Sequence, residues 1–398
     1  KGSIEEADMI FISVNTPTKN KGLGAGKASD LKWVEESARQ VAKYSKGHTI
    51  VVEKSTLPVR TAEVIQSILR STELDNDKGS KSFNVLSNPE FLAEGSAILD
   101  LEKPDRVLIG GENLEAMNSL SDIYTKWVPK EKILFTNIWS SELAKLTANA
   151  FLAQRISSIN SIAALCEATG ADVREVARAI GTDSRIGSKF LDSGPGFGGS
   201  CFKKDILNLV YLSQYFGLDE VARFWESVVN LNNWHQNRIT ELIVKKLFGT
   251  VTGKKIVILG FAFKANTNDT RESAAIQICK ALIDEGAEIT IHDPKVNEIQ
   301  IEKDLQMQQT KKFESDNENR LLYKNGNWKF SKSLNIFDEA HAVLMLTEWD
   351  EYKNIDWEDV SKRMVQPAWV FDSRSIIEPS KIRNTNLNLW RVGDGTDQ

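Results

Sequence analysis

The chain is poor in cysteine, with three in 398 residues, and none of them stands in a CxxC pair. An odd number of widely spaced cysteines provides neither a disulfide framework nor the sulfur ligands of a zinc site. Positive charge is not in excess either, since 50 Lys and Arg against 55 Asp and Glu give a formal net charge of −5. This balance argues against a nucleic-acid or anionic-membrane surface, which needs clustered positive charge.

Long apolar stretches are absent as well. The longest run, residues 256–263, is far too short to span a bilayer. The composition, with 41% hydrophobic and 26% charged residues, is that of an ordinary globular protein. At roughly 150 residues per domain, the length leaves room for two or three domains. We therefore expect a soluble protein of the cytoplasm, with no membrane and no nucleic acid among its partners.

The chain contains no GxGxxG dinucleotide fingerprint. The glycine cluster at residues 22–27 has Lys27 in place of the third glycine, and it is no P-loop because Lys21 stands where GxxxxGK requires glycine. The cluster at residues 196–201 fails GxGxxG at Cys201 and GxSxG at Phe202.

Short apolar runs alternate with amphipathic helical patterns over residues 1–137. Helices are expected at residues 30–46 (capped by Asp30), 60–69 and 114–126. They separate five expected strands, at residues 9–14, 49–52, 83–87, 106–110 and 133–136. Such alternation predicts a largely parallel, doubly wound sheet.

A helical pattern covers residues 138–250, interrupted only by Gly170, Gly181 and glycines at 194–199. The α/β pattern then resumes over residues 251–398. It predicts a helix at residues 273–285 and strands at residues 254–260, 288–292, 342–347 and 369–372, with a polar surface excursion at 311–332. We predict an α/β protein in which two Rossmann-like, doubly wound α/β domains, 1–137 and 251–398, are joined by a long central helical domain, 138–250.

The strongest local signal is the glycine-rich segment at residues 194–205, which leads into a predicted helix. Glycines let the backbone approach a ligand closely, and a helix N-terminus presents free N–H groups and partial positive charge. Cys201 stands at this junction with Lys203 and Lys204 beside it, a setting that favours the nucleophilic thiolate. The alternative is a small core residue before a helix.

Lys145 and Asn149 stand at the head of a helical stripe that is otherwise apolar and ends at Cys166. Burial of a lysine there costs free energy unless its charge binds a ligand or pairs with an acidic group. The alternative is a snorkelling lysine paired with Glu142, three residues earlier. Cys166 and Cys279 lie on apolar helix faces, and we expect both in the core.

Polar residues follow three strands of the first predicted sheet, at 15–18, 53–56 and 87–94. In open α/β sheets ligands bind at the carboxyl ends of the strands, so Glu90 and Glu94 of the third segment stand where ligands bind. Helix capping by these acids and simple turns in the other two segments are the alternatives.

Taken together, these segments resemble the UDP-glucose 6-dehydrogenases, in their eukaryotic and particularly plant-like form. The likeness runs from about Ile4 to Arg374. It rests on strings in a fixed order, among them EKST at 53–56, SNPEFLAEG at 87–95, GFGGSC at 196–201, LGFAFK at 259–264 and DTRES at 269–273.

The resemblance implies oxidation of UDP-glucose to UDP-glucuronate by two successive hydride transfers to NAD+. Cys201 would be the nucleophile, forming a thiohemiacetal and then a thioester that water hydrolyses. This agrees with the residues themselves, since holding an aldehyde through a second oxidation calls for a covalent anchor. The other catalytic positions that the resemblance implies hold the C6 oxygen, exchange protons or position water: Lys145, Asn149, Glu90, Asp205 and Thr56.

The resemblance also implies binding residues and an oligomer. Substrate contacts fall on Phe190, Arg185, Gly196, Phe197, Gly198, Lys204, Phe263, Lys264 and Arg374, with Arg185 reaching a neighbouring subunit's sugar site. NAD contacts fall on Val14, Asn15, Thr16, Pro17, Thr18, Ser55, Glu94 and Arg271. The assembly would be a homo-oligomer, a dimer or a hexamer of dimers, and no metal is implied.

The sequence departs from the family at its start, where the strand–GxGxxG–helix unit and the acidic residue after it are missing. We therefore expect a first sheet that lacks central strands and exposes edges and apolar faces. We also expect these 398 residues alone to be deficient in NAD binding and poorly active. An inactive fragment or paralogue that acts only as an assembly partner is the alternative function.

Smaller departures are Ala265 and Asn266, where the family usually has Lys-Asp, and Asn268 in place of glycine. A related dehydrogenase of GDP-mannose or UDP-N-acetyl sugars would keep the same cysteine chemistry. The eukaryotic-type strings disfavour that reading.

Overall fold

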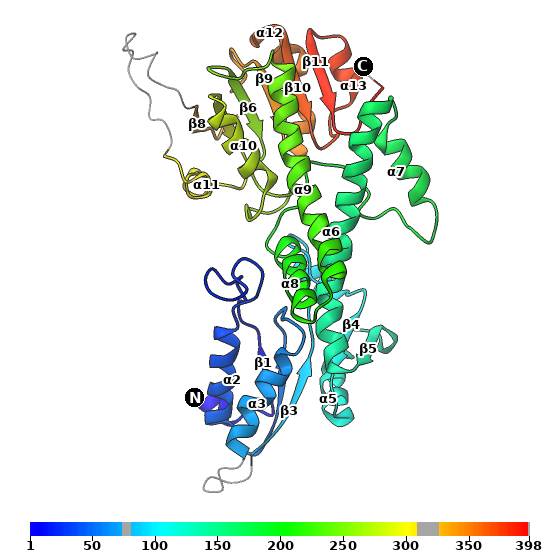
Figure 1. Cartoon of the computed structure of the whole chain (residues 1–398), viewed down its shortest axis with the longest axis vertical. Helices are drawn as coiled ribbons and strands as arrows, with labels where there is room; N and C mark the ends of the chain where they lie inside the picture. The colour runs from blue at the N-terminus through cyan, green and yellow to red at the C-terminus, as the bar shows by residue number, and fades with distance from the viewer. Residues whose placement is uncertain (74–80, 309–325, 397–398) are drawn as a thin grey trace. The chain divides into compact units, whose positions relative to one another are not determined.

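The computed structural model describes residues 1–73, 81–308 and 326–396. The chain forms two compact units, one of Lys1–Phe151 with Lys204–Glu226 and the other of Leu152–Lys203 with Ser227–Gln398. Each unit contains one sheet, and Figure 1 labels the helices and strands. The division into three domains at residues 137 and 250 stays a prediction.

The sheet of the first unit has the order β1-β2-β3-β4-β5. These strands are β1 (Met9–Ile12), β2 (His48–Glu53), β3 (Ser82–Ser87), β4 (Val107–Gly110) and β5 (Ile133–Thr136). All neighbours are parallel except β3 and β4, which meet antiparallel at Ser87 and Gly110. The largely parallel sheet is thus confirmed. β1 is an edge strand, and its Phe11 is 44% exposed.

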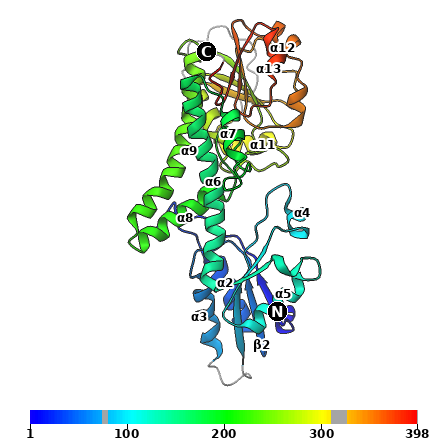
Figure 2. The same ribbon diagram turned by 90° about the vertical axis from the view of Figure 1, so that its right-hand side faces the viewer.

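Helices cover both faces of this sheet because successive strand residues point to opposite sides. Val51 packs with α2 (Lys32–Tyr44) and α3 (Thr61–Glu73), which lie side by side in Figures 1 and 2. Val52, the next residue, packs with α5 (Leu114–Tyr124) on the other face. Doubly wound packing is therefore confirmed for this unit.

The first unit also contains shorter helices and parts of three longer ones: α1 (Gly2–Glu5), α4 (Ala97–Glu102), η1 (Lys130–Lys132), α6 (Ile138–Thr169, as far as Phe151), α8 (Phe202–Tyr215, from Lys204) and α9 (Asp219–Lys246, as far as Glu226). The expectation that Asp30 caps the helix at 30–46 is wrong. The N-cap position of α2 is Leu31, and Asp30 Oδ1 instead accepts a hydrogen bond from the backbone N–H of Lys32 at 3.0 Å.

The sheet of the second unit is parallel throughout, in the order β11-β10-β9-β6-β7-β8. Its strands are β6 (Lys255–Leu259), β7 (Glu288–His292), β8 (Asn327–Phe330), β9 (Ala342–Met345), β10 (Ala368–Asp372) and β11 (Leu387–Arg391). Numbered along the chain from β6, this is the doubly wound order 3-2-1-4-5-6, which has its switch point between β6 and β9. The second Rossmann-like domain is thereby confirmed.

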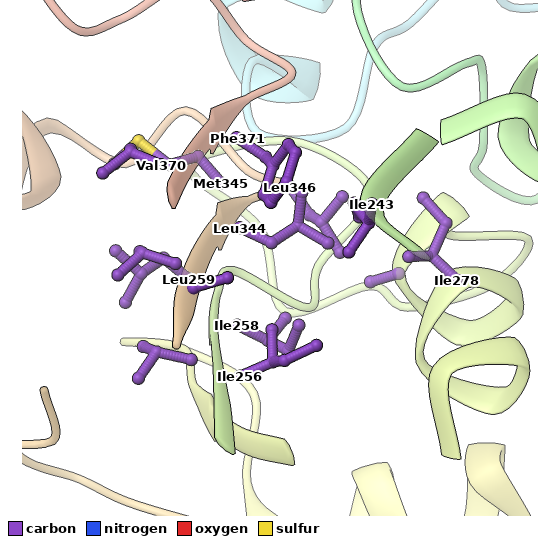
Figure 3. Close-up of a cluster of buried hydrophobic side chains, with 14 of the residues drawn as sticks. Ile243, Ile256, Ile258, Leu259, Ile278, Leu344, Met345, Leu346, Val370 and Phe371 are labelled. Carbon is purple, nitrogen blue, oxygen red and sulfur yellow. The ribbon is translucent and has the colours of Figure 1, made fainter. Parts of the chain in front are cut away.

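The core of this unit lies between the sheet and its helices. Figure 3 shows side chains of the central strands, such as Ile258 and Leu344, close to Ile243 of α9 (Asp219–Lys246) and Ile278 of α10 (Ala274–Asp284). Cys166 and Cys279 belong to the same buried cluster, which confirms that both are core residues. α6 and α9 lie side by side here, joined by an Arg238–Glu167 ion pair at 2.7 Å.

The remaining elements of the second unit are α7 (Val173–Gly181), α11 (Glu298–Leu305), η2 (Asp350–Asn354), α12 (Trp357–Arg363) and α13 (Pro379–Arg383). Two expectations for this region are wrong. Residues 182–201 contain no helix, so the break in the helical middle is much longer than its glycines indicated. The predicted surface segment at 311–332 includes a strand, β8, whose Trp328 is 1% exposed. Residues 311–325 of this segment lie outside the described residues.

Candidate active site

The carboxyl ends of β1, β2 and β3 meet at one edge because these strands are parallel. The segments that follow β1 and β2 are joined there. Ser55 Oγ accepts a hydrogen bond from the Val14 N–H at 2.8 Å and donates one to the Val14 carbonyl at 2.7 Å. Thr16 Oγ1 donates to the Thr56 carbonyl at 3.0 Å. The structure thus brings four of the predicted residues together in one polar rim.

Asp205 lies in the first turn of α8 and is 1% exposed. Asn149 of α6 donates from Nδ2 to Asp205 Oδ2 at 2.6 Å, and Lys204 Nζ lies 3.7 Å from Oδ1. Burial raises the pKa of Asp205, opposed by the charge of Lys204 and by the Asn149 hydrogen bond. Lys204 Nζ also lies 3.5 Å from Thr16 Oγ1, so this group adjoins the polar rim.

Lys145 of α6 is 5% exposed, with its Nζ 5.4 Å from the ring centroid of Phe91. It makes no ion pair within the described ranges. Glu142, the alternative partner, instead accepts hydrogen bonds from the backbone N–H groups of Arg60 at 2.7 Å and Ala62 at 2.8 Å. An ammonium buried in this way costs free energy unless its charge serves a ligand.

Lys54 was missed as a site residue, although it belongs to the EKST string. Its Nζ lies 3.2 Å from Asn88 Oδ1 and 3.3 Å from the Tyr124 hydroxyl. Burial lowers the pKa of Lys54 to about 8, with Glu90 opposing and Lys145 adding to the shift. Two cations and one carboxylate therefore share this end of the sheet.

Neither predicted acid caps a helix. Glu90 and Glu94 precede α4, whose N-cap position is Ser96, and both are half-buried in the loop after β3.

Three predicted NAD contacts lie beside the glycine loop at residues 19–28. Asn15 and Pro17 are exposed, and Thr18 pairs with Ser29.

In the second unit, Cys201 is exposed and directly precedes the first residue of α8. Its Sγ lies 3.4 Å from Ser200 Oγ. Of the two lysines expected beside the thiol, Lys203 forms an ion pair with Glu272 at 2.8 Å. Cys201 is the exposed one of the three cysteines, so a reagent in solution can reach it.

The glycine segment before Cys201 is held by buried polar side chains that sequence reasoning missed. Asn160 Oδ1 accepts from the Gly194 N–H at 3.0 Å, and His235 Nε2 lies 2.8 Å from the Gly194 carbonyl. Asn232 bonds both backbone groups of Phe197, at 2.8 and 3.2 Å. Isolated polar residues on apolar helix faces are the signal that could have found them.

Phe263, Lys264 and Arg374 lie together in the second unit. Arg374 donates to the Phe263 carbonyl at 2.8 Å and pairs with Glu348 at 3.1 Å. Lys264 Nζ lies 5.6 Å from the Phe263 ring centroid. A Cβ on Gly198 would stand 2.9 Å from Phe263 Cβ, so the glycine segment packs directly on this cluster.

Three predicted contacts, Arg185, Phe190 and Arg271, lie neither in the polar rim of the first unit nor in the cluster of Phe263, Lys264 and Arg374. The Arg185 side chain is 87% exposed and pairs with Asp183 at 2.6 Å, and Phe190 is 39% exposed with φ of 62°. Arg271 pairs with Asp269 at 2.7 Å in the second unit, whereas the other predicted NAD contacts belong to the first. Phe197 is 4% exposed, so its side chain is not available to a ligand, and its predicted substrate contact stays a prediction for the backbone.

Across residues 1–73, 81–308 and 326–396, no group of three or more His, Cys, Asp or Glu side chains is placed to hold a metal ion. No helix in the same ranges is both long and apolar enough to cross a bilayer.

Comparisons with known proteins agree with this arrangement. Three models of the UDP-glucose/GDP-mannose dehydrogenase family match: its NAD-binding domain at residues 1–128, its central domain at 139–234 and its UDP-binding domain at 257–379. UDP-glucose 6-dehydrogenase 4 of Arabidopsis thaliana is 52% identical over 99% of this chain and 82% of its own length. UDP-glucose 6-dehydrogenase 5 of Oryza sativa subsp. japonica is 51% identical with the same coverage.

Among solved structures, a UDP-glucose dehydrogenase from Pyrobaculum islandicum superposes with a TM-score of 0.79 at 29% identity. The superposition covers 99% of this chain and 81% of that one. The resemblance drawn from the residues is therefore confirmed, and the chain belongs to the UDP-glucose/GDP-mannose dehydrogenase family, whose members bind NAD.

Proposed function

We propose that this chain oxidises UDP-glucose to UDP-glucuronate in two successive two-electron steps, with Cys201 as the covalent anchor. The observation that carries the proposal is the exposed Cys201 at the end of a rigidly held glycine segment, directly before α8. The names of the relatives that share about half of its residues support the substrate.

NAD+ supplies the hydride acceptor. The donor set at the carboxyl edge of β1 and β2 fits it, because hydroxyl and backbone groups suit ribose hydroxyls and a carboxamide. Val14–Thr18, Ser55 and Glu94 would hold it there, with Arg271 as a further contact.

The chemistry balances in four steps. The C6 alcohol loses a hydride to NAD+ and a proton to the protein, which gives an aldehyde. The Cys201 thiolate adds to the aldehyde carbon, and the oxygen takes a proton to form a thiohemiacetal. Loss of a second hydride, to a second NAD+, and of that proton would give a thioester. Attack by water would then break the C–S bond and release the carboxylate, the thiol and a proton.

The first unit supplies the polar groups for these steps. Lys145 is a buried cation suited to oxyanion character at C6. Asn149 gives one amide N–H to Asp205, and its second N–H is left for the same substrate oxygen. Asp205 and Thr56 would position the water, and Glu90 would exchange the proton during thioester hydrolysis.

Most of the proposed contacts to the UDP-sugar belong to the second unit. Phe263, Lys264 and Arg374 would form its binding cluster, together with the backbone of Gly196, Phe197 and Gly198. Phe190 and Lys204, which lie outside this cluster, would be further substrate contacts. The alternative of an inactive assembly partner is not favoured, because the positions proposed for catalysis carry the side chains that the chemistry needs.

We also propose a cytoplasmic homo-oligomer, a dimer or a hexamer of dimers. An apolar surface of the first unit supports it: Phe151, Leu218, Val221 and Phe224 are 54, 52, 42 and 51% exposed. Apolar patches of this kind mark protein interfaces. The exposed Arg185 would then reach the sugar site of a neighbouring subunit.

The test is to incubate the purified protein with UDP-glucose and NAD+ and to measure NADH and UDP-glucuronate together. We expect two NADH for each UDP-glucuronate. One NADH with released aldehyde would overturn the covalent mechanism, and a clear preference for GDP-mannose or a UDP-N-acetyl sugar would overturn the substrate. Absence of NADH with every sugar nucleotide, despite saturating NAD+, would support the inactive alternative.

A further inference from the structure

Two buried glutamates of the first unit face each other. Glu53 ends β2 and is 1% exposed, Glu142 lies on α6 and is 2% exposed, and their carboxyl groups are in hydrogen-bond contact. An ionised carboxylate only accepts hydrogen bonds, so this contact requires a proton. The pair therefore holds at least one proton while the contact exists.

The surrounding donors show which glutamate carries it. Both oxygens of Glu142 accept backbone N–H groups at the start of α3, from Arg60 at 2.7 Å and Ala62 at 2.8 Å. An anion is also favoured at a helix N-terminus, so Glu142 is the carboxylate. Glu53 Oε2 is buried and no N–H or O–H of the described structure donates to it, so Glu53 is the acid.

The pair connects three segments that carry proposed site residues or support them. Glu53 directly precedes Lys54, Ser55 and Thr56. Glu142 lies one helical turn before Lys145 on α6, and it also binds the start of α3, where Arg60 has φ of 77°. A left-handed backbone at arginine is held by its surroundings, and Glu142 supplies part of that support.

We propose that Glu53 and Glu142, sharing one proton, are positioning residues that lock the Thr56 segment and the Lys145 turn of α6 onto the start of α3. Neither glutamate touches substrate in this proposal, which rests on the proposed function because it acts through Lys145 and Thr56. Loss of the shared proton places two carboxylates in contact, and a second proton removes the charge that binds α3.

The other charged groups on the packed elements are engaged elsewhere. The Arg60 guanidinium pairs with Glu63 at 2.7 Å on α3, Lys54 Nζ faces Asn88, Tyr124 and Glu90, and Lys145 lies over Phe91. Burial raises the pKa of Glu142 to about 7 and raises that of Glu53 well above its ordinary value. The pair therefore holds protons at pH values at which exposed glutamates are ionised.

The test compares Glu53→Gln with Glu53→Leu in the full chain. The glutamine amide can donate to Glu142 as the protonated acid does, so we expect kcat within about twofold of the wild type. Leucine removes the donor, and we expect kcat to fall about tenfold or more. The KM for UDP-glucose should change little, because the proposed substrate contacts other than Lys204 belong to the second unit. Glu115→Gln, at an exposed glutamate in the first turn of α5, is the matched control.

Equal kcat for the leucine variant and the wild type would overturn the proposal, and so would an equal loss in the glutamine and leucine variants. The free energy of unfolding, measured at a series of pH values, distinguishes failure of the glutamate-pair proposal from failure of the proposed function. Because its pKa is raised in the fold, Glu142 should make the wild type less stable as pH rises from about 4.5 to about 7. Glu142→Gln should show a smaller decline, because only the part that comes from the raised pKa of Glu53 remains. If the decline is as large in Glu142→Gln as in the wild type, the pair is not titrating as proposed, whether or not the protein is an active dehydrogenase.

Discussion

Asn149 of α6 donates its amide N–H to Asp205 of α8 at 2.6 Å, and both side chains are buried. The bond orients a carboxylate whose pKa is raised by burial and leaves the second amide N–H for another acceptor. This hydrogen bond thus orients two residues of the proposed reaction. Asp205 would position the water, and Asn149 would donate to the C6 oxygen.

Asp205→Asn should slow thioester hydrolysis while leaving the first oxidation largely intact. The isosteric amide keeps the volume of the side chain but loses the charge, and acid–base and positioning roles of this kind contribute about 10²–10⁴-fold. We expect a rapid burst of NADH followed by a steady rate on the order of 10²-fold below the wild type, measured by stopped-flow absorbance.

Mass spectrometry of the quenched variant should show an acyl group on the protein. Asp219→Asn, an exposed acid at the start of α9, is the control and should behave as the wild type. A steady rate equal to that of the wild type would show that Asp205 does not take part in hydrolysis.

Cys201→Ser should abolish UDP-glucuronate formation, with a loss on the order of 10³-fold, since serine is a much weaker nucleophile at neutral pH. The three cysteines differ in exposure, and burial raises the pKa of the Cys279 thiol. A thiol reagent under native conditions should therefore label Cys201 alone, as read by peptide mass mapping.

Cys166→Ser is the matched control for this substitution, because it changes the same atom in the core. It should lower stability and leave kcat near the wild-type value. Comparable labelling of Cys166 or Cys279 in the folded protein would contradict the structural assignment.

Gly198→Ala should weaken UDP-glucose binding. The added Cβ would stand 2.5 Å from the Glu272 carbonyl oxygen and 2.9 Å from Phe263 Cβ, and backbone cannot move aside cheaply. We expect a loss of stability of about 1–3 kcal/mol and a KM for UDP-glucose raised at least tenfold, from thermal unfolding and steady-state kinetics.

Gly187→Ala is the control for this glycine. Its φ is +72° with nothing within 4 Å of the added Cβ, so only backbone strain of about 1 kcal/mol applies. If both variants raise KM equally, the close packing of Gly198 on Phe263 has no part in substrate binding.

Apolar patterns predicted the bounds of both a largely exposed strand, β5, and a buried one, β7. The strands at 133–136 and 288–292 end at the expected residues, since turn-forming or polar residues bound both runs. β8 was missed because its one buried side chain, Trp328, stands among polar neighbours. Residues 327–330 form a strand because they pair with β7, and such pairing is not a local property of the sequence.

The site was predictable only as a set of residue types at strand ends and at the glycine segment. Sequence patterns placed Cys201 before a helix, but they could not show that Lys203 is bound to Glu272. Nor could they show that Glu142 faces Glu53 rather than Lys145, because local spacing makes Lys145 the nearer candidate. The partner of each charged side chain depends on tertiary contacts between distant segments, and the local spacing of residues does not show these contacts.

His235 should make stability depend on pH below neutrality. Burial, and secondarily the charge of Arg238, lowers the pKa of His235 to about 4, while its bond to the Gly194 carbonyl opposes the shift. A histidine with a lowered pKa in the fold binds fewer protons there than in the unfolded chain, so stability falls as pH drops from about 6.5 to about 4. The full shift corresponds to about 3 kcal/mol. Urea unfolding at a series of pH values should show His235→Gln losing this decline, whereas exposed His48→Gln should keep it. Because the raised pKa of Glu142 changes stability in the opposite direction over the same range, the difference between wild type and variant, rather than either curve alone, measures the histidine.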